Sequence, residues 1–179
     1  MKYFKQVLFI AACAVVVSGA HCAIAQTNNA AAKIGVYDSR ALAYAHFCSP
    51  EYQQQLSNEV RTARLAKKNG DQAQFEKLSR ALAEKQRVIH RESFSTAPAT
   101  EALAFLQSRL PDIQKQAGVS ALVSKWDTNT LKQYSSATQA DVTDLLVQQF
   151  QLTDKQLKTV TALQKHPPVS LEKIDKMKD

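Results

Sequence analysis

The stretch KIGVYD at residues 33–38 decides how the rest of the chain is interpreted. Its β-branched and aromatic residues suit a short strand. A second short apolar run, ALVSKWD at residues 121–127, follows only after a long interval with helical periodicity and few glycines. The sequence therefore predicts a mainly α fold with a small β-sheet (α+β). Two short strands, residues 33–38 and 120–126, would be joined by a long helical-hairpin excursion.

Residues 1–25 have the pattern of a cleavable secretory signal peptide. Lys2 and Lys5 give it a positive start. Residues 7–17 form an uncharged apolar core, and AIA at residues 23–25 supplies the small residues that a signal peptidase needs. The apolar core is short for a bilayer span, although a retained anchor is the alternative. We therefore expect export, with the periplasm as the compartment.

The rest of the chain is long enough for one domain. We expect a flexible leader at residues 26–32, a single domain at residues 33–150 and a helical C-terminal extension at residues 151–179. Loss of the signal peptide lowers the formal net charge from +7 to +5, because two lysines leave with it. This mild positive charge permits contact with anionic lipid or lipopolysaccharide, whereas export argues against a nucleic-acid partner.

Residues 50–94 predict an antiparallel helical hairpin. Ser49 and Pro50 are a strong helix start, because serine accepts orphan amide hydrogens and proline suits the first helical position. The NGD turn at residues 69–71 separates two narrow apolar stripes with helical spacing. The stripes are thin, so the outer arm should be mobile or supported by another subunit. The residues expected to pack the hairpin are Tyr52, Leu56, Val60, Phe75, Leu78 and Leu82.

The STAP segment at residues 95–98 breaks the helical pattern, because proline disfavours helix in the residue before it. A further helix is expected at residues 99–117, with Pro111 as a kink or a second start and Gly118 as its end. Residues 128–140 are polar and have the composition of turns. Short helices are expected near residues 141–150, 154–165 and 170–174.

Three landmarks follow one another along the chain. The first is the signal peptide followed by KIGVYDSR at residues 33–40. The second is the paired-helix excursion with Ser-Pro at residues 49–50 near its base. The third is QAGV at residues 116–119, which leads into LVSKW at residues 122–126 and then DVT at residues 141–143. In these landmarks the chain resembles the OmpH/Skp family of periplasmic chaperones.

The resemblance covers about residues 33–150. It implies a homo-oligomer, a trimer, whose strands form an assembly body and whose hairpins hold unfolded outer-membrane proteins without ATP. The break at residues 95–98 and the extension at residues 151–179 depart from the family pattern. The arm is also short, since a helix over residues 50–68 spans roughly 28 Å at about 1.5 Å per residue.

No combination of residues predicts catalysis, a metal site or a cofactor. The histidines at 46, 90 and 166 are scattered, and the chain lacks a glycine-rich phosphate loop and a nucleophile elbow. Asp127 and Asp141 are either a carboxylate pair or have capping and turn roles, and the capping and turn roles are the simpler interpretation. Ser95 and Thr96 either cap a helix break or bind a ligand at a helix N-terminus. Cys48 is the single cysteine after residue 25, so we expect a buried structural thiol, with a reactive or intermolecular thiol as the alternative.

The predicted hairpin tip is basic. No acidic residue lies between Val60 and Gly70. A solvated helix end is one interpretation, because cations favour a helix C-terminus, and contact with clients or an anionic surface is the other. The cationic residues are Arg61, Arg64, Lys67 and Lys68. The sequence thus favours a non-enzymatic periplasmic holdase or assembly factor for unfolded envelope proteins. The alternative is an exported structural or interaction protein with no holdase activity.

Overall fold

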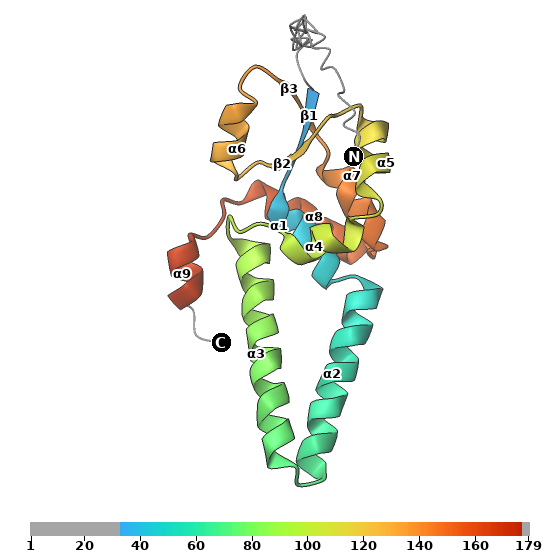
Figure 1. Ribbon diagram of the computed structural model, residues 1–179, viewed down its shortest axis with the longest axis vertical. Helices are drawn as coiled ribbons and strands as arrows, with labels where there is room; N and C mark the ends of the chain where they lie inside the picture. Colours follow the sequence, from blue (N-terminus) through green and yellow to red (C-terminus); the bar gives the residue numbers. More distant parts are fainter. Residues whose placement is uncertain (1–32, 177–179) are drawn as a thin grey trace, which may run out of the picture.

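The computed structural model describes residues 33–176 (Figure 1). The expected signal peptide at residues 1–25 and the leader at residues 26–32 lie outside this range. Within it, helices dominate and three short strands form one parallel sheet. The mainly α prediction with a small sheet is therefore confirmed. The sheet lies at one end of the molecule, and a helical hairpin projects from the other end (Figure 1).

The sheet has the order β2-β1-β3, with the first strand of the chain in its centre. The strands are β1 (Lys33–Tyr37), β2 (Leu122–Ser124) and β3 (Thr138–Asp141). Both outer strands run parallel to β1, as strands do when a long crossover brings the chain back in the same direction. The central position of β1 explains why Ile34 is fully buried.

The third strand is absent from the sequence prediction. Over residues 128–140 the sequence predicts polar turns, but the structure has α6 (Thr128–Gln133), which the Asp127 carboxylate caps, and then β3. The sequence of β3 has no apolar alternation, so the strand exists because its backbone pairs with β1. The predicted strand at residues 120–126 is also shorter in the structure, because the Asp127 amide donates to the Ser124 carbonyl and turns the chain.

The core is built around α1 (Ser39–Phe47), which follows β1 directly. The Asp38 carboxylate caps its first turn by accepting from the Arg40 amide. This helix is buried over most of its length and packs against α4 (Thr100–Leu106), α7 (Thr143–Val147) and α8 (Asp154–Lys165). Each fully buried leucine-sized side chain contributes about 1.5–3 kcal/mol. The short α1 is therefore the element on which the rest of the fold is assembled.

The hairpin consists of α2 (Pro50–Lys68) and α3 (Gln72–Phe94), close to the predicted bounds. Ser49 Oγ accepts from the Tyr52 amide, and Pro50 occupies the first turn. At the tip, Gly70 takes φ = 75°, a left-handed conformation that suits glycine and closes α2. The base of α3 packs against α1, so the arm is anchored in the core at one end only.

The break after α3 returns the chain to the body. Ser39 Oγ donates to the Ala97 carbonyl at 3.0 Å, and Ala97 and Ala99 are buried. The helix predicted at residues 99–117 is divided into α4 and α5 (Leu110–Ala117), and Pro111 lies in the first turn of α5. A second helix start was one of the two predicted effects of this proline. Gly118, with φ = 63°, ends α5 as predicted.

The C-terminal extension folds back onto the body and onto α3. After α7 the chain continues through η1 (Gln148–Phe150) to α8, whose N-terminus has a capping box at Thr153. The last helix, α9 (Leu171–Lys176), lies beside α3 (Figure 1). The Val169 amide donates to the Phe94 carbonyl at 2.8 Å, and Ile174 is buried. The described extension, residues 151–176, is thus packed into the fold rather than appended to it.

Candidate functional site

The hairpin tip is cationic and exposed. All four residues predicted for the tip, Arg61, Arg64, Lys67 and Lys68, are exposed. Across the turn, α3 adds two exposed cations that sequence reasoning did not include, Lys77 and Arg80. Only Asp71 and Glu76 oppose them between residues 60 and 81. The positive charges of Lys77 and Arg80 are visible in the sequence, but assigning them to the tip requires knowing that the two helices fold side by side.

A groove of about 450 Å³ lies on α2, partway along the arm. It is lined by Leu56, Ser57, Val60, Arg61 and Arg64, and apolar atoms predominate in its surface. The structure therefore brings two of the predicted packing residues and two of the predicted cations together in one hollow. Arginine offers both an apolar aliphatic stem and a planar fork of N–H donors, so this groove suits a ligand with apolar and anionic parts.

The other predicted cations behave differently. Lys67 Nζ lies 5.2 Å from the centroid of the Phe75 ring, which places a cation over an aromatic face across the hairpin turn. Neither Lys67 nor Lys68 lines the groove. The four-residue basic run thus divides into two arginines at the groove and two lysines at the end of the helix.

The packing inside the hairpin differs from the predicted stripe at both ends. Leu56, Val60, Phe75, Leu78 and Leu82 are partly buried, which fits the thin stripe. Near the tip, Ala63 and Ala66 of α2 are buried, because small side chains let two helices approach closely. Tyr52 is buried, but its ring packs on His46 and Phe47 of the body. It therefore anchors the base of the arm.

An ion pair joins the two helices of the arm. Lys85 Nζ lies 2.6 Å from Glu59 Oε1, and both side chains are partly exposed. The hydrogen bond from Lys85 lowers the pKa of Glu59. Lys85 occupies the position where the apolar stripe of α3 is interrupted, so the interruption is filled by a cross-helix pair.

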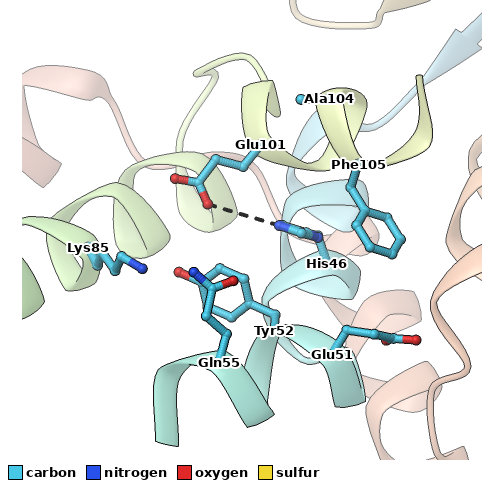
Figure 2. Close-up of a pocket in the computed structure, with 8 residues that line it drawn as sticks. All are labelled: His46, Glu51, Tyr52, Gln55, Lys85, Glu101, Ala104 and Phe105. Atoms are coloured by element: carbon cyan, nitrogen blue, oxygen red, sulfur yellow. Dashed lines mark ion pairs between the residues drawn. The ribbon is translucent and has the colours of Figure 1, made fainter. Parts of the chain in front are cut away.

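A pocket of about 400 Å³ lies at the base of the hairpin, where α1, α2, α3 and α4 meet (Figure 2). Figure 2 shows the His46 ring extending from α1 toward Glu101 and Phe105 of α4, above Tyr52 of α2. The pocket combines aromatic faces with ionisable groups. Its lining residues are His46, Glu51, Tyr52, Gln55, Lys85, Glu101, Ala104 and Phe105.

His46 is the most enclosed polar group of this pocket, with a side chain that is 9% exposed. Burial lowers the pKa of its imidazole. Its Nε2 lies 4.0 Å from Glu101 Oε2, which is too long for a hydrogen bond, and its Nδ1 has no hydrogen-bond partner among the described residues. Sequence reasoning treated His46 as a surface or partly buried histidine, because its partners come from other helices.

At the other end of the molecule, Asp38 is the centre of a buried polar network. Its carboxylate accepts from Arg40, from Lys125 Nζ at 2.7 Å and from Trp126 Nε1 at 3.1 Å. Burial by itself would raise the pKa of Asp38, but these three side-chain hydrogen bonds lower it to about 2. The Asp38 amide also donates to Thr143 Oγ1 at 3.1 Å. This network joins β1, α1, α7 and the segment after β2, so its role is to hold the body together.

The remaining candidates from the sequence have structural roles. Asp127 accepts from the Thr130 amide and caps α6, and Asp141 accepts from the Thr143 amide in a turn before α7, so the two carboxylates have capping and turn roles. Ser95 is fully buried, and its hydroxyl accepts from the Ala97 amide within the helix break.

Cys48 is partly exposed rather than fully buried, and burial raises the pKa of its thiol. A raised pKa leaves less of the reactive thiolate, which agrees with a structural role. In the described part of the chain, no group of three or more His, Cys, Asp or Glu residues is placed to hold a metal ion. Over the same residues, no helix is long and apolar enough to span a membrane.

Comparisons of the chain with protein-family models, with curated proteins and with solved structures found no match. The functional interpretation therefore depends on the geometry of the arm, the groove and the pocket.

Proposed function

We propose that this protein is a non-enzymatic periplasmic chaperone or assembly factor that binds unfolded outer-membrane or other envelope proteins with its hairpin arm. The observation that supports the proposal is the groove on α2, where Leu56 and Val60 lie beside Arg61 and Arg64. The resemblance of the sequence to the OmpH/Skp family supports it independently. No nucleotide and no cofactor is needed for this kind of binding.

The chemistry of the proposed clients suits the groove. Strands of outer-membrane barrels alternate apolar and polar residues, so an unfolded segment presents both kinds of side chain in succession. In the groove, Leu56 and Val60 can contact the apolar side chains of such a segment. The guanidinium groups of Arg61 and Arg64 can bind the carboxylates among its polar side chains. A single contact of this size is weak, so useful affinity requires several arms, and a trimer would supply three.

An aggregation assay tests the proposal directly. An unfolded outer-membrane barrel protein is diluted from denaturant with and without the chain, and light scattering is followed. We expect suppression by the native protein and loss of suppression in the double variant R61E/R64E. The matched control is K155E/K158E, which makes the same change in charge at the same spacing on exposed positions of α8. Equal suppression by both double variants, or no suppression by the native protein, would reject the holdase.

The alternative is an exported structural or interaction protein of the envelope that never holds unfolded clients. The shortness of the arm favours it, because the 19 residues of α2 span only roughly 28 Å at about 1.5 Å per residue. Sedimentation of the mature protein separates the two. A strict monomer over a wide concentration range would contradict a trimer of arms and leave the interaction protein.

The basic tip supports a second kind of contact within the same proposal. The exposed cations of the arm are placed to meet anionic lipid or lipopolysaccharide, and surface attraction of this kind weakens as salt screens it. Flotation with vesicles that contain anionic lipid measures it. We expect K67E/K68E to reduce co-flotation at low salt, and unchanged co-flotation would remove the membrane surface from the list of partners.

A further inference from the structure

We propose that the pocket at the base of the hairpin binds a guanidinium or alkylammonium group. This site is separate from the groove on α2, and the inference does not depend on the holdase. The juxtaposition that carries it is that of the Glu101 carboxylate with the His46 imidazole and the Tyr52 ring at one cavity, which Glu51 and Phe105 also line (Figure 2).

The aromatic wall is the first part of the argument. The His46 ring lies 5.1 Å from the Tyr52 ring and 5.4 Å from the Phe105 ring, measured between centroids. Phe105 also stacks on Phe150 at 5.5 Å, which holds it in place although it is partly exposed. Aromatic faces attract cations through the negative charge density above the ring, and the attraction grows where water is excluded.

The charge balance of the pocket is the second part. Lys85 is the one lysine or arginine of the lining, and its ammonium group pairs with Glu59 at 2.6 Å, outside the pocket lining. Within residues 33–176, no lysine or arginine forms an ion pair with Glu51 or Glu101. The cavity therefore presents two uncompensated carboxylates, which favour a cation and disfavour an anion.

His46 is the third part. Its side chain is about nine-tenths buried and lines the cavity, yet Nδ1 lacks a partner and Nε2 stands 4.0 Å from the Glu101 carboxylate. Buried polar atoms are normally hydrogen-bonded, so an incomplete set of bonds indicates room for a further group. Burial also favours the neutral imidazole, which does not repel a cation. A cationic N–H donor beside this pair would donate to the carboxylate and to an imidazole lone pair together.

The size of the cavity fits this ligand class. At about 400 Å³ the pocket lies at the small end of the range of roughly 300–1,000 Å³ that is typical of small-molecule sites. A guanidinium has five N–H donors in a planar fork, which matches a carboxylate and a neighbouring imidazole nitrogen better than a spherical ion does. The structure already places one guanidinium against this wall, since Arg109 lies over the Phe105 ring at 5.7 Å. The same group is available from a free small molecule or from an arginine side chain of a peptide.

Titration with two probes tests the proposal and distinguishes these sources. Agmatine presents a guanidinium on a small cation, and the blocked peptide acetyl-Gly-Arg-Gly-amide presents it on a neutral backbone. Binding is followed by NMR of isotope-labelled protein, including the imidazole resonances of His46. We expect saturable shifts at His46 with at least one probe. Binding of agmatine alone assigns a free small cation, and binding of the peptide assigns an arginine side chain.

Variants decide whether the pocket is responsible. We expect E51Q/E101Q to weaken binding about tenfold or more, because the negative charge of the lining and a charge-assisted hydrogen bond to Glu101 are lost. F105L, which keeps apolar volume without the ring, should weaken it severalfold. The control is E76Q/E172Q, which removes two exposed carboxylates far from the pocket. The amide spectra of each variant show whether it is folded. Unchanged affinity in folded E51Q/E101Q, or no binding of either probe, would overturn the proposal.

The holdase proposal and the cation-pocket proposal can be rejected independently of each other. The groove variant R61E/R64E should leave binding of the cationic probe unchanged, and E51Q/E101Q should leave suppression of aggregation unchanged. Loss of probe binding in R61E/R64E would contradict the assignment of the ligand to the pocket.

Discussion

Asp38 and Arg40 form a buried ion pair, in which Arg40 Nη2 lies 2.9 Å from Asp38 Oδ2 while the two side chains are 0% and 2% exposed. Arg40 also donates through Nη1 to the His166 carbonyl at 2.9 Å and lies over the Trp126 ring. Its guanidinium thus links the start of α1 to the end of α8. One pair of residues close together in sequence thereby ties the C-terminal extension to the centre of the body.

Removal of the Asp38 carboxylate should be strongly destabilising. D38A leaves the Arg40 charge buried with fewer partners, and breaking a buried pair in this way costs about 3–5 kcal/mol. Urea unfolding followed by circular dichroism measures the change. D175A is the matched control, because Asp175 and its partner Arg91 are exposed and 3.9 Å apart, and we expect a change of under about 0.5 kcal/mol there. Equal effects of the two substitutions would show that the Asp38 network is not important for stability.

The same carboxylate predicts a loss of stability in acid. Burial opposes ionisation of Asp38, but its hydrogen bonds lower its pKa from 3.8 to about 2. A depressed pKa in the folded state gives stability that is present above pH 3.8 and is lost as the pH falls through 2. The difference corresponds to about 2 kcal/mol. D38N should show a smaller loss of stability between pH 4 and pH 2 than the native chain, and parallel curves would contradict this source of the loss.

Glu92 should give folding stability the opposite dependence on pH, because its pKa is raised rather than lowered. It is 7% exposed, Oε1 accepts from the Thr100 amide at 3.3 Å, and Oε2 has no partner within the described residues. Burial, aided by Glu101 and opposed by the Thr100 hydrogen bond, raises its pKa from 4.5 to about 7. The folded state then binds more protons than the unfolded state between these values, so stability falls as the pH rises through this window.

The substitution E92Q isolates this effect, because glutamine has nearly the same shape and no charge. We expect E92Q to be more stable than the native protein by about 2 kcal/mol at pH 8 and to differ little at pH 5. Unfolding by urea at both values checks it. E172Q, at an exposed glutamate on α9, is the control and should show no such difference. An effect of E92Q that is the same at both pH values would contradict a titrating Glu92.

In the centre of the sheet, the position of Gly35 has no room for a larger side chain. A Cβ atom at this position would lie 2.9 Å from Leu122 Cδ2 and 2.9 Å from Val142 Cγ2, closer than side chains normally come. G35A should therefore cost about 1–3 kcal/mol through overpacking. The stiff valine leaves less room for adjustment than the end of the leucine.

A double-mutant cycle tests the cause. V142A should recover part of the loss in the G35A background, so that the double variant is more stable than the sum of the single changes predicts. Additive losses would show that G35A acts through the backbone instead.

A larger side chain at Ala63 should destabilise the hairpin arm without unfolding the body. It is 4% exposed where the two hairpin helices come close, so A63L should force them apart. Because the core lies at the other end of the molecule, we expect faster amide exchange over residues 60–82 and unchanged exchange in α1. The substitution A73L, at an exposed position near the tip, is the control. Faster exchange in both regions would contradict an arm that opens independently.

The hairpin was predictable because its signals are local. Ser49, Pro50 and Gly70 determine where the helices begin and end through caps and backbone conformation within a few residues. The apolar spacing on each helix adds the face that packs. The same holds for the Thr153 capping box and for Gly118 at the end of α5. In each case the interacting groups are separated by less than two helical turns.

The third strand and the pocket were not predictable in this way. The sequence of β3 contains no apolar alternation, and its pairing partner, β1, lies more than one hundred residues earlier. His46, Tyr52 and Glu101 are brought together by three helices, so no spacing in the chain indicates that they share a cavity. The indole N–H of Trp126 donates to the Asp38 carboxylate, a contact between residues 88 positions apart that no local pattern indicates.

The sequence by itself determined the two hairpin helices, the turn between them and the basic character of the arm, because capping, periodicity and charge are properties of neighbouring residues. Only the tertiary structure decided that the sheet has three parallel strands and that Arg61 and Arg64 line an apolar groove while Lys67 and Lys68 do not. It also decided that Glu51 and Glu101 line one pocket with His46, Tyr52 and Phe105 at the base of the arm. Strand pairing, burial and cavities depend on which distant segments meet, and that choice is made by the packing of the whole chain.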